Sequence, residues 1–92
     1  MELNTLRSQI DQIDDQLICL FCQRMEIAGR IADFKKANGL PVHIPEREQE
    51  KFLQIAEKAG PEMADYTRTL FSTLFALSRD YQNAKNSREA DR

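Results

Sequence analysis

The sequence predicts an all-α protein with three helices per chain, one long, one short and one of medium length, that pairs with a second copy of itself. Three observations predict this fold class: a long 3-4 repeat of apolar residues, two breaks that contain glycine and proline, and no segment that alternates apolar with polar residues. The repeat has eight apolar members and one arginine, and it comprises Leu6, Ile10, Ile13, Leu17, Leu20, Arg24, Ile27, Ile31 and Phe34. Residues at this spacing form one seam along an amphipathic helix.

The long helix is expected over roughly residues 5–38. Asn4 or Thr5 can supply its N-cap, and Asn38-Gly39 ends it. At about 1.5 Å per residue this helix is about 50 Å long, whereas a compact domain of this size is only about 30 Å across. The protruding seam therefore needs a second copy of the chain. We expect an intertwined, symmetric homodimer in which the long helices lie against each other.

Two further helices complete the chain. Pro45 suits the first position of the short helix, and Gly60-Pro61 ends it. The medium helix is expected from about Glu62 into the mid-80s, on a second 3-4 repeat. Residues 1–86 are thus assigned to one helical domain, and residues 87–92 to a polar C-terminal tail that is expected to fray.

Composition narrows the function classes. The formal net charge is −2, from 13 basic and 15 acidic residues, so no basic excess is available to neutralise the phosphates of a nucleic acid. No run of about 18 apolar residues is present to span a membrane. The first residues lack both the basic and the apolar region of a signal peptide. We therefore expect a cytoplasmic protein with neither nucleic acid nor membrane as a partner.

Cys19 and Cys22 form a C-x-x-C pair with two interpretations. Redox thiols at this spacing gain reactivity near a helix N-terminus, and a zinc site needs two more ligands. This pair falls in mid-helix instead, and the single histidine, His43, is about twenty residues away. We favour two small apolar residues buried one turn apart, and we expect no metal site.

Cationic side chains along the long helix are the first candidate functional residues. Arg24 lies in the seam, where a desolvated guanidinium costs several kcal/mol unless an anion meets it. Lys35 follows eleven residues later, about 20° away around the helix, and shares its face. Arg7 lies roughly 25 Å from Arg24 along the axis. It can reach the same small ligand only from the partner chain of an antiparallel dimer.

The other two helices add four candidates. Ser78 and Gln82 are one turn apart on one face of the medium helix, and Arg47 and Glu48 lie in the first turn of the short one. Each candidate also has an ordinary interpretation, since a polar seam residue fixes register in coiled coils and charges near helix ends complement the dipole. Only the combination of these residues favours a site for a small polyanion.

This combination resembles the all-helical class of chorismate mutase, small intertwined dimers that also occur fused to prephenate-processing enzymes. Each matching segment is weakly diagnostic alone, whereas five in order at compatible spacings are specific. The similarity covers nearly the whole chain and is carried by Leu6-Arg7-x-x-Ile10-Asp11-x-x-Asp14, Gln23-Arg24-Met25, Ala32-Asp33-Phe34-Lys35, Pro41-Val42-His43-Ile44-Pro45-Glu46-Arg47-Glu48 and Ser78-x-x-x-Gln82.

The resemblance implies a Claisen rearrangement of chorismate to prephenate, in phenylalanine and tyrosine biosynthesis, with no cofactor. The protein's task is then to hold the dicarboxylate in its reactive shape and to stabilise charge at the breaking ether bond. The resemblance implies that Arg24, together with Arg7 of the partner subunit, pairs with the two carboxylates. It also implies that Lys35 and Gln82 donate to the ether oxygen.

The remaining roles follow from the same resemblance. Glu48 is expected to accept from the ring hydroxyl, Arg47 to orient Glu48 and add positive potential, and Ser78 to hydrogen-bond a carboxylate. The chain departs from the family pattern at Ile44, where many relatives carry an aspartate. An isoleucine is a poor N-cap and offers no side-chain acceptor, so only its backbone can approach the hydroxyl.

Two other functions stay open at the level of the residues. An isochorismate-pyruvate lyase shares this fold and similar cations, but Glu48 favours the mutase because that position looks apolar in a lyase relative. A non-enzymatic helical dimerisation module explains the seam and its arginine. It does not explain Ser78 and Gln82, nor the arginines spaced for use across two chains. The expected partners are therefore chorismate and a second copy of the chain.

Overall fold

The computed structural model describes residues 2–90, and within that range it consists of three α-helices and no strand. Helix α1 spans Glu2–Ala37, α2 spans Pro45–Ala59 and α3 spans Ala64–Ala90. The predicted all-helical class, with one long, one short and one medium helix, is confirmed. The short helix also begins and ends where the sequence places it, with Gly60 following at a φ of 85° that favours glycine.

Two boundaries differ from the predicted ones. Helix α1 already begins at Glu2, so Asn4 and Thr5 lie within its first turns and do not cap it. Helix α3 continues through Ala90 and includes the start of the predicted polar tail, because no glycine or proline follows Pro61 to stop it. Positions 91 and 92 of that tail lie outside the described residues.

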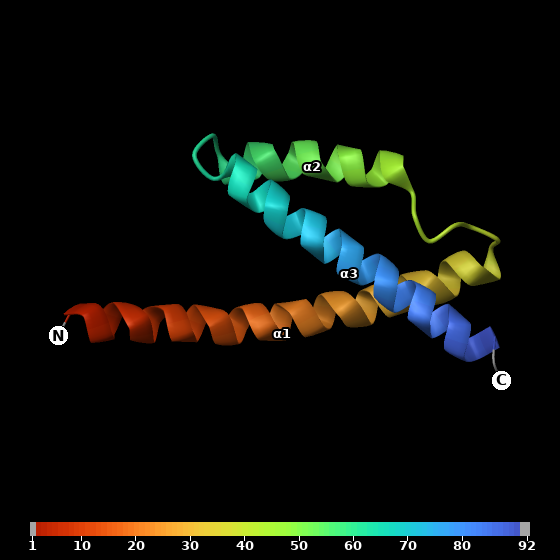
Figure 1. Ribbon diagram of the computed structural model, residues 1–92, viewed down its shortest axis with the longest axis horizontal. Helices are drawn as coiled ribbons and strands as arrows, with labels where there is room; N and C mark the ends of the chain where they lie inside the picture. The colour runs from red at the N-terminus through yellow and green to blue at the C-terminus, as the bar shows by residue number, and fades with distance from the viewer. Residues whose placement is uncertain (1, 91–92) are drawn as a thin grey trace.

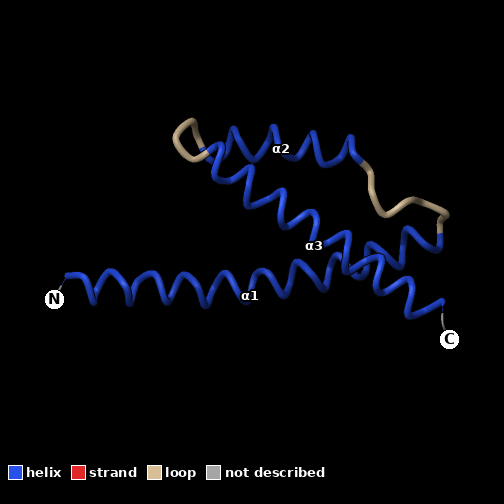
Figure 2. The backbone as a smooth tube through the Cα atoms, in the orientation of Figure 1, coloured by secondary structure: helices blue, strands red, loops and turns tan. Residues whose placement is uncertain are grey.

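The three helices form an open arrangement. Helix α3 packs against α2 near its own N-terminus and crosses the C-terminal half of α1 further along (Figure 1). The N-terminal half of α1 extends away from both shorter helices (Figure 2). The radius of gyration is 16.6 Å and the extents are 55 × 30 × 14 Å, whereas a compact chain of this length has a radius of about 12 Å. The single chain is therefore not a closed bundle.

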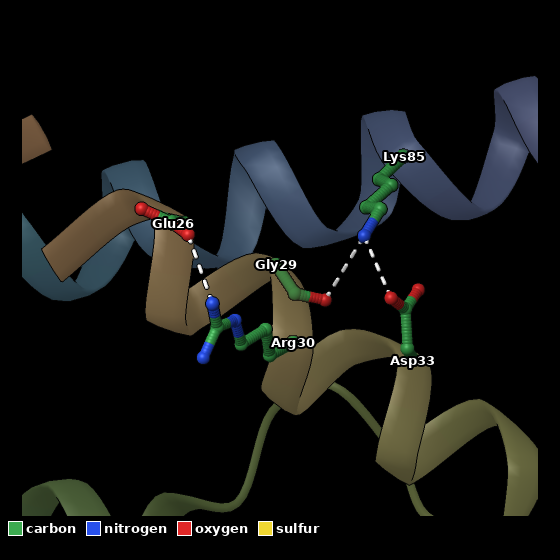
Figure 3. Close-up of polar contacts among 5 residues, drawn as sticks. All are labelled: Glu26, Gly29, Arg30, Asp33 and Lys85. Atoms are coloured by element: carbon green, nitrogen blue, oxygen red, sulfur yellow. Dashed lines mark hydrogen bonds and ion pairs between the residues drawn. The ribbon is translucent and has the colours of Figure 1, made fainter. Parts of the chain in front are cut away.

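Small residues let α3 approach α1 closely at their crossing. Ala28 and Gly29 are buried, and a Cβ on Gly29 would lie 3.3 Å from ring atom Cε2 of Tyr81. The Lys85 ammonium adds polar contacts, donating to the Gly29 carbonyl oxygen at 3.2 Å and to Asp33 Oδ2 at 2.8 Å (Figure 3). These contacts fix how α3 lies on α1.

An aromatic cluster joins α2 to α3. The Phe52 and Phe75 rings meet edge to face with centroids 5.0 Å apart, and Phe71 meets Phe75 in the same way at 6.0 Å. Phe75 and Ile55 are buried. The cluster holds the first half of α3 against α2, and it therefore sets where the following residues of α3 face α1.

Most of the α1 seam is exposed in the single chain. Its members from the first half of the helix, which are each more than half exposed, are Leu6, Ile10, Ile13, Leu17 and Leu20. The total accessible surface is 7427 Å², compared with about 5,500 Å² for a compact monomer of this mass. The chain thus presents an unusually large apolar surface along the part of α1 that no other helix covers.

Two other expectations concern the surfaces of the helices. Cys19 and Cys22 are free and exposed, so their expected burial is wrong for the single chain. Cys19 lies about 200° around α1 from Leu17, which places it on the face away from the seam. No helix among residues 2–90 is both long enough and apolar enough to cross a bilayer.

Candidate active site

A cavity of about 380 Å³ lies where α1, α3, the α1–α2 connection and the first turn of α2 meet. Its volume is within the range of about 300–1,000 Å³ that small-molecule sites occupy. The apolar part of its wall comprises Ile27, Ala28, Ile31, Val42, Ile44 and Phe75. The polar part comprises Arg24, Lys35, Arg47, Glu48, Ser78, Arg79 and Gln82.

Arg24 is held in place by α3. Its Nη1 donates to the Ser78 hydroxyl at 2.6 Å, and its guanidinium carbon lies 5.6 Å from the centroid of the Phe75 ring. Ser78 and Phe75 are themselves buried. A cation over an aromatic face is stabilised electrostatically, and the single bond to Ser78 leaves most of the five guanidinium donors for a ligand.

Lys35 is positioned by the connection that follows α1. Its Nζ donates to the Val42 carbonyl oxygen at 2.8 Å, and the Leu40 N–H donates to the Lys35 carbonyl oxygen at 2.8 Å. The connection therefore turns back over the last turn of α1 and draws the ammonium toward the cavity. An ammonium has three donors, so two remain after the bond to Val42.

Gln82 presents an unpaired polar atom in the cavity wall. The residue is only 6% exposed, and its Oε1 is buried without a hydrogen-bond partner. A buried polar group left unpaired costs about 1–3 kcal/mol. Gln82 lies one turn from Ser78 on α3 and lines the same cavity as Arg24, so its Nε2 group is the part of the amide that can donate to a ligand there.

Glu48 contacts an arginine that the sequence analysis did not select. Arg79 Nη1 donates to Glu48 Oε2 at 2.5 Å, and His43 Nε2 lies 3.7 Å from the same oxygen. Arg79 lies directly after Ser78 and three residues before Gln82, which gives it access to the same side of α3. That spacing could have indicated Arg79 as a cavity residue, but nothing in the sequence shows that residues 48 and 79 meet.

The two remaining predicted residues differ in position. Arg47 is exposed but lines the cavity beside Glu48. Arg7 lies far out on α1, exposed and away from the cavity, roughly 25 Å from Arg24 along the helix axis. The single chain therefore brings six of the seven predicted site residues to one cavity and leaves Arg7 outside it.

Positive charge predominates around the cavity. Four cationic side chains line it against one acidic side chain, Glu48. Clefts lined by one sign of charge concentrate ions of the other sign, so the site suits a small ligand with more than one negative charge. Among residues 2–90, no group of three or more His, Cys, Asp or Glu side chains could hold a metal ion. The arrangement is equipped to bind and orient a polyanion.

Comparison with known proteins gives a match to the family chorismate mutase type II over residues 6–83. The chain is 44% identical over 54 residues to the bifunctional chorismate mutase/prephenate dehydratase of Aquifex aeolicus, an alignment that covers 59% of this chain and 15% of that protein. It is 45% identical over 62 residues to the T-protein of Haemophilus influenzae, covering 63% of this chain and 16% of that protein.

A third relative is shorter. The chain is 35% identical over 48 residues to the chorismate mutase of Methanocaldococcus jannaschii, covering 52% of this chain and 48% of that protein. The chain thus spans about a sixth of the length of the first two relatives and about half of the third. No solved structure gave a significant match.

Proposed function

This chain belongs to the chorismate mutase type II family, and we propose that it catalyses the rearrangement of chorismate to prephenate in the biosynthesis of phenylalanine and tyrosine. The observation that carries the proposal is the cavity itself. It combines two seam-face cations, Arg24 and Lys35, with the buried side chain of Gln82. We place the activity in the cytoplasm and within the helical domain of residues 1–86.

The reaction needs a substrate held in one conformation and stabilisation of developing charge, and it needs no nucleophile. In one concerted step the ether C–O bond breaks while a new C–C bond forms, and no atom leaves the molecule. Holding a flexible dicarboxylate in its reactive conformation removes part of the entropic barrier. Donors that are already placed where charge develops on the ether oxygen lower the barrier further.

Arg24 binds one substrate carboxylate through its free guanidinium donors. A guanidinium and a carboxylate match as a two-bond fork, and the bond from Arg24 Nη1 to Ser78 at 2.6 Å fixes the orientation of the fork. The Ser78 hydroxyl adds a hydrogen bond to a carboxylate. The apolar wall beside these groups excludes water, which strengthens each of these contacts.

Lys35 and Gln82 act on the breaking ether bond. Lys35 keeps two donors after its bond to the Val42 carbonyl, and the Gln82 side chain is buried in the wall, where its Nε2 group is the donor and its Oε1 can only accept. Both groups donate to the ether oxygen as negative charge builds there. These contacts strengthen in the transition state, so they raise kcat and not merely affinity.

The first turn of α2 recognises the ring hydroxyl. Glu48 accepts a hydrogen bond from it, and Arg47 adds positive potential beside it. Ile44 offers no side-chain acceptor at this point, and it caps α2 without a side-chain hydrogen bond. Glu48 is therefore the side chain that accepts the hydrogen bond from the ring hydroxyl.

We propose that the active form is an intertwined homodimer with antiparallel α1 helices. The exposed seam and the surplus accessible surface support this, since a stable interface buries on the order of 1,600 Å². An antiparallel pair would carry Arg7 of the partner subunit to each cavity, where it binds the second carboxylate. Ile27 lines the cavity. If Arg7 of the partner subunit lies opposite Ile27, the two-fold axis passes near Leu17, which is midway between these two positions in the sequence.

The direct test of the function is the ultraviolet absorbance of chorismate mixed with the purified protein. Loss of chorismate with formation of prephenate supports the proposal. Isochorismate is offered separately, because a lyase of this fold would release salicylate and pyruvate from it. A protein that leaves chorismate unchanged, or that acts on isochorismate alone, would contradict the proposal.

A further inference from the structure

Arg79 occupies the cavity wall and contacts the acidic residue of the site. Its side chain is 30% exposed and that of Glu48 is 22% exposed, and they meet at 2.5 Å between Nη1 and Oε2. His43 approaches the same Oε2 atom. Both contacts thus involve one carboxylate oxygen, which leaves Oε1 of Glu48 for a ligand.

The pair also joins two elements at a point where α2 has little else to fix it. The side chain of Ile44 makes no cap hydrogen bond, and the Ile44 carbonyl accepts only local bonds from the Arg47 and Glu48 N–H groups. The side chain of Arg79 on α3 reaches across to this first turn. It sets the direction of the Glu48 carboxylate relative to Ser78 and Gln82.

Charge gives Arg79 a second effect. A carboxylate in a site for a dicarboxylate repels the ligand, and the repulsion is strong where water is partly excluded. A guanidinium bonded to that carboxylate offsets its charge while leaving the second oxygen as an acceptor. Arg79 therefore allows an acidic side chain to serve in an otherwise cationic cavity.

We propose that Arg79 is a positioning residue for hydroxyl recognition, holding Glu48 toward the substrate hydroxyl and offsetting its negative charge. This inference rests on the proposed function. No bond to the hydroxyl oxygen forms or breaks in the reaction, so its contact with Glu48 is of similar strength in the substrate and in the transition state. Loss of such a contact raises KM and leaves kcat nearly unchanged.

The test is steady-state kinetics with chorismate on the parent protein and its Arg79→Gln and Arg79→Lys variants. Arg79→Gln is expected to raise KM about tenfold and to change kcat less than about threefold. Arg79→Lys keeps the charge and should recover most of the affinity. The matched control is Arg30→Gln, which removes a guanidinium from an exposed Arg–Glu pair on α1, 3.1 Å from Glu26, and should leave both constants unchanged.

A double variant separates positioning from simple structural support. Adding Glu48→Gln to Arg79→Gln removes the uncompensated carboxylate, so KM should fall below that of Arg79→Gln alone. If Arg79→Gln does not fold, Arg79→Met carries the test with the same expected rise in KM, and a kcat loss as large as that rise overturns the inference. An unchanged KM in Arg79→Gln, or a double variant no better than the single one, also overturns it. A parent protein without chorismate turnover would instead overturn the proposed function, and this inference with it.

Discussion

The side chains of the cavity keep hydrogen-bonding capacity that the protein does not use. Arg24 and Lys35 each give one donor to a protein acceptor and keep the others. Gln82 keeps a buried oxygen with no partner at all. An unpaired polar atom inside a protein costs stability, and the retention of this amide is explained if its Nε2 group donates to the ligand. We therefore regard Gln82 as the residue where stability is given up for catalysis.

Replacing Gln82 with methionine tests whether this residue lowers stability and contributes to catalysis. Gln82→Met keeps the length of the side chain and removes the unpaired amide, so the free energy of unfolding should rise by about 1 kcal/mol. The lost donor to the ether oxygen should lower kcat by about 10²–10³. Denaturant unfolding and chorismate turnover, measured on the same preparation, check the two effects. A variant that is both less stable and fully active would contradict the role of Gln82.

Residue types and spacing indicated most of the cavity but not all of it. Arg24 was predictable because a charge in an apolar seam needs an anion, and Ser78 and Gln82 because they share a helical face. Arg79 was missed because its partner, Glu48, is remote in the sequence and only the packing of α2 on α3 brings them together. The exposure of Cys22 was missed for a similar reason, since burial depends on which faces α3 covers.

At the scale of elements, the α1–α3 crossing determines the geometry of the site. Gly29 allows the Tyr81 ring to approach, and Lys85 bonds α3 to the Gly29 carbonyl and to Asp33 (Figure 3). Gln82 lies one turn before Lys85 on α3. A change in the separation of the helices at Gly29 is therefore transmitted directly to the wall of the cavity.

A large side chain at Gly29 should damage stability and activity together. Gly29→Leu is expected to lower the free energy of unfolding by about 1–3 kcal/mol, because the added atoms meet the Tyr81 ring in a filled space. It should also lower kcat/KM, because α3 is displaced. Ala37→Leu places the same side chain at an exposed position at the end of α1 and serves as the control. Equal unfolding midpoints for the two variants, at equal protein concentration, would contradict this view of the crossing.

Helix ends were predictable where glycine or proline marks them and not elsewhere. Pro45 and Gly60 fixed both ends of α2, because proline suits a first turn and glycine accepts a positive φ. The start of α1 and the end of α3 carry no such residue. There the helices continue through Asn4 and through Ala90, since nothing in the sequence stops them.

At the scale of the whole molecule, the length of α1 is the decisive feature. The helix is longer than the rest of the chain can cover, and the seam residues of its first half remain exposed. The uncovered length of the helix was predictable from chain length and helix rise alone. The homodimer that this uncovered length implies stays a proposal. The exposed seam and the distant Arg7 are two independent consequences of one long helix.

A charge in the seam should separate the subunits. Leu17→Glu places a carboxylate near the proposed two-fold axis, where two copies meet and repel, so the dimer should dissociate and chorismate turnover should be lost. Light scattering on a size-exclusion column measures the mass. Ser8→Glu adds the same charge on the opposite face of α1 and should leave both mass and turnover unchanged. A Leu17→Glu protein that keeps its mass and activity would exclude the seam as the interface.

The central claim is that each active site takes Arg24 from one chain and Arg7 from the other. The most direct measurement mixes the Arg7→Ala and Arg24→Ala variants, each expected to be inactive alone, and refolds them together. Half of the resulting dimers then hold one site with both arginines intact, so turnover should return to about a quarter of the parent value. Mixed dimers that form and stay inactive, or an Arg7→Ala variant with the parent's turnover, would contradict the account.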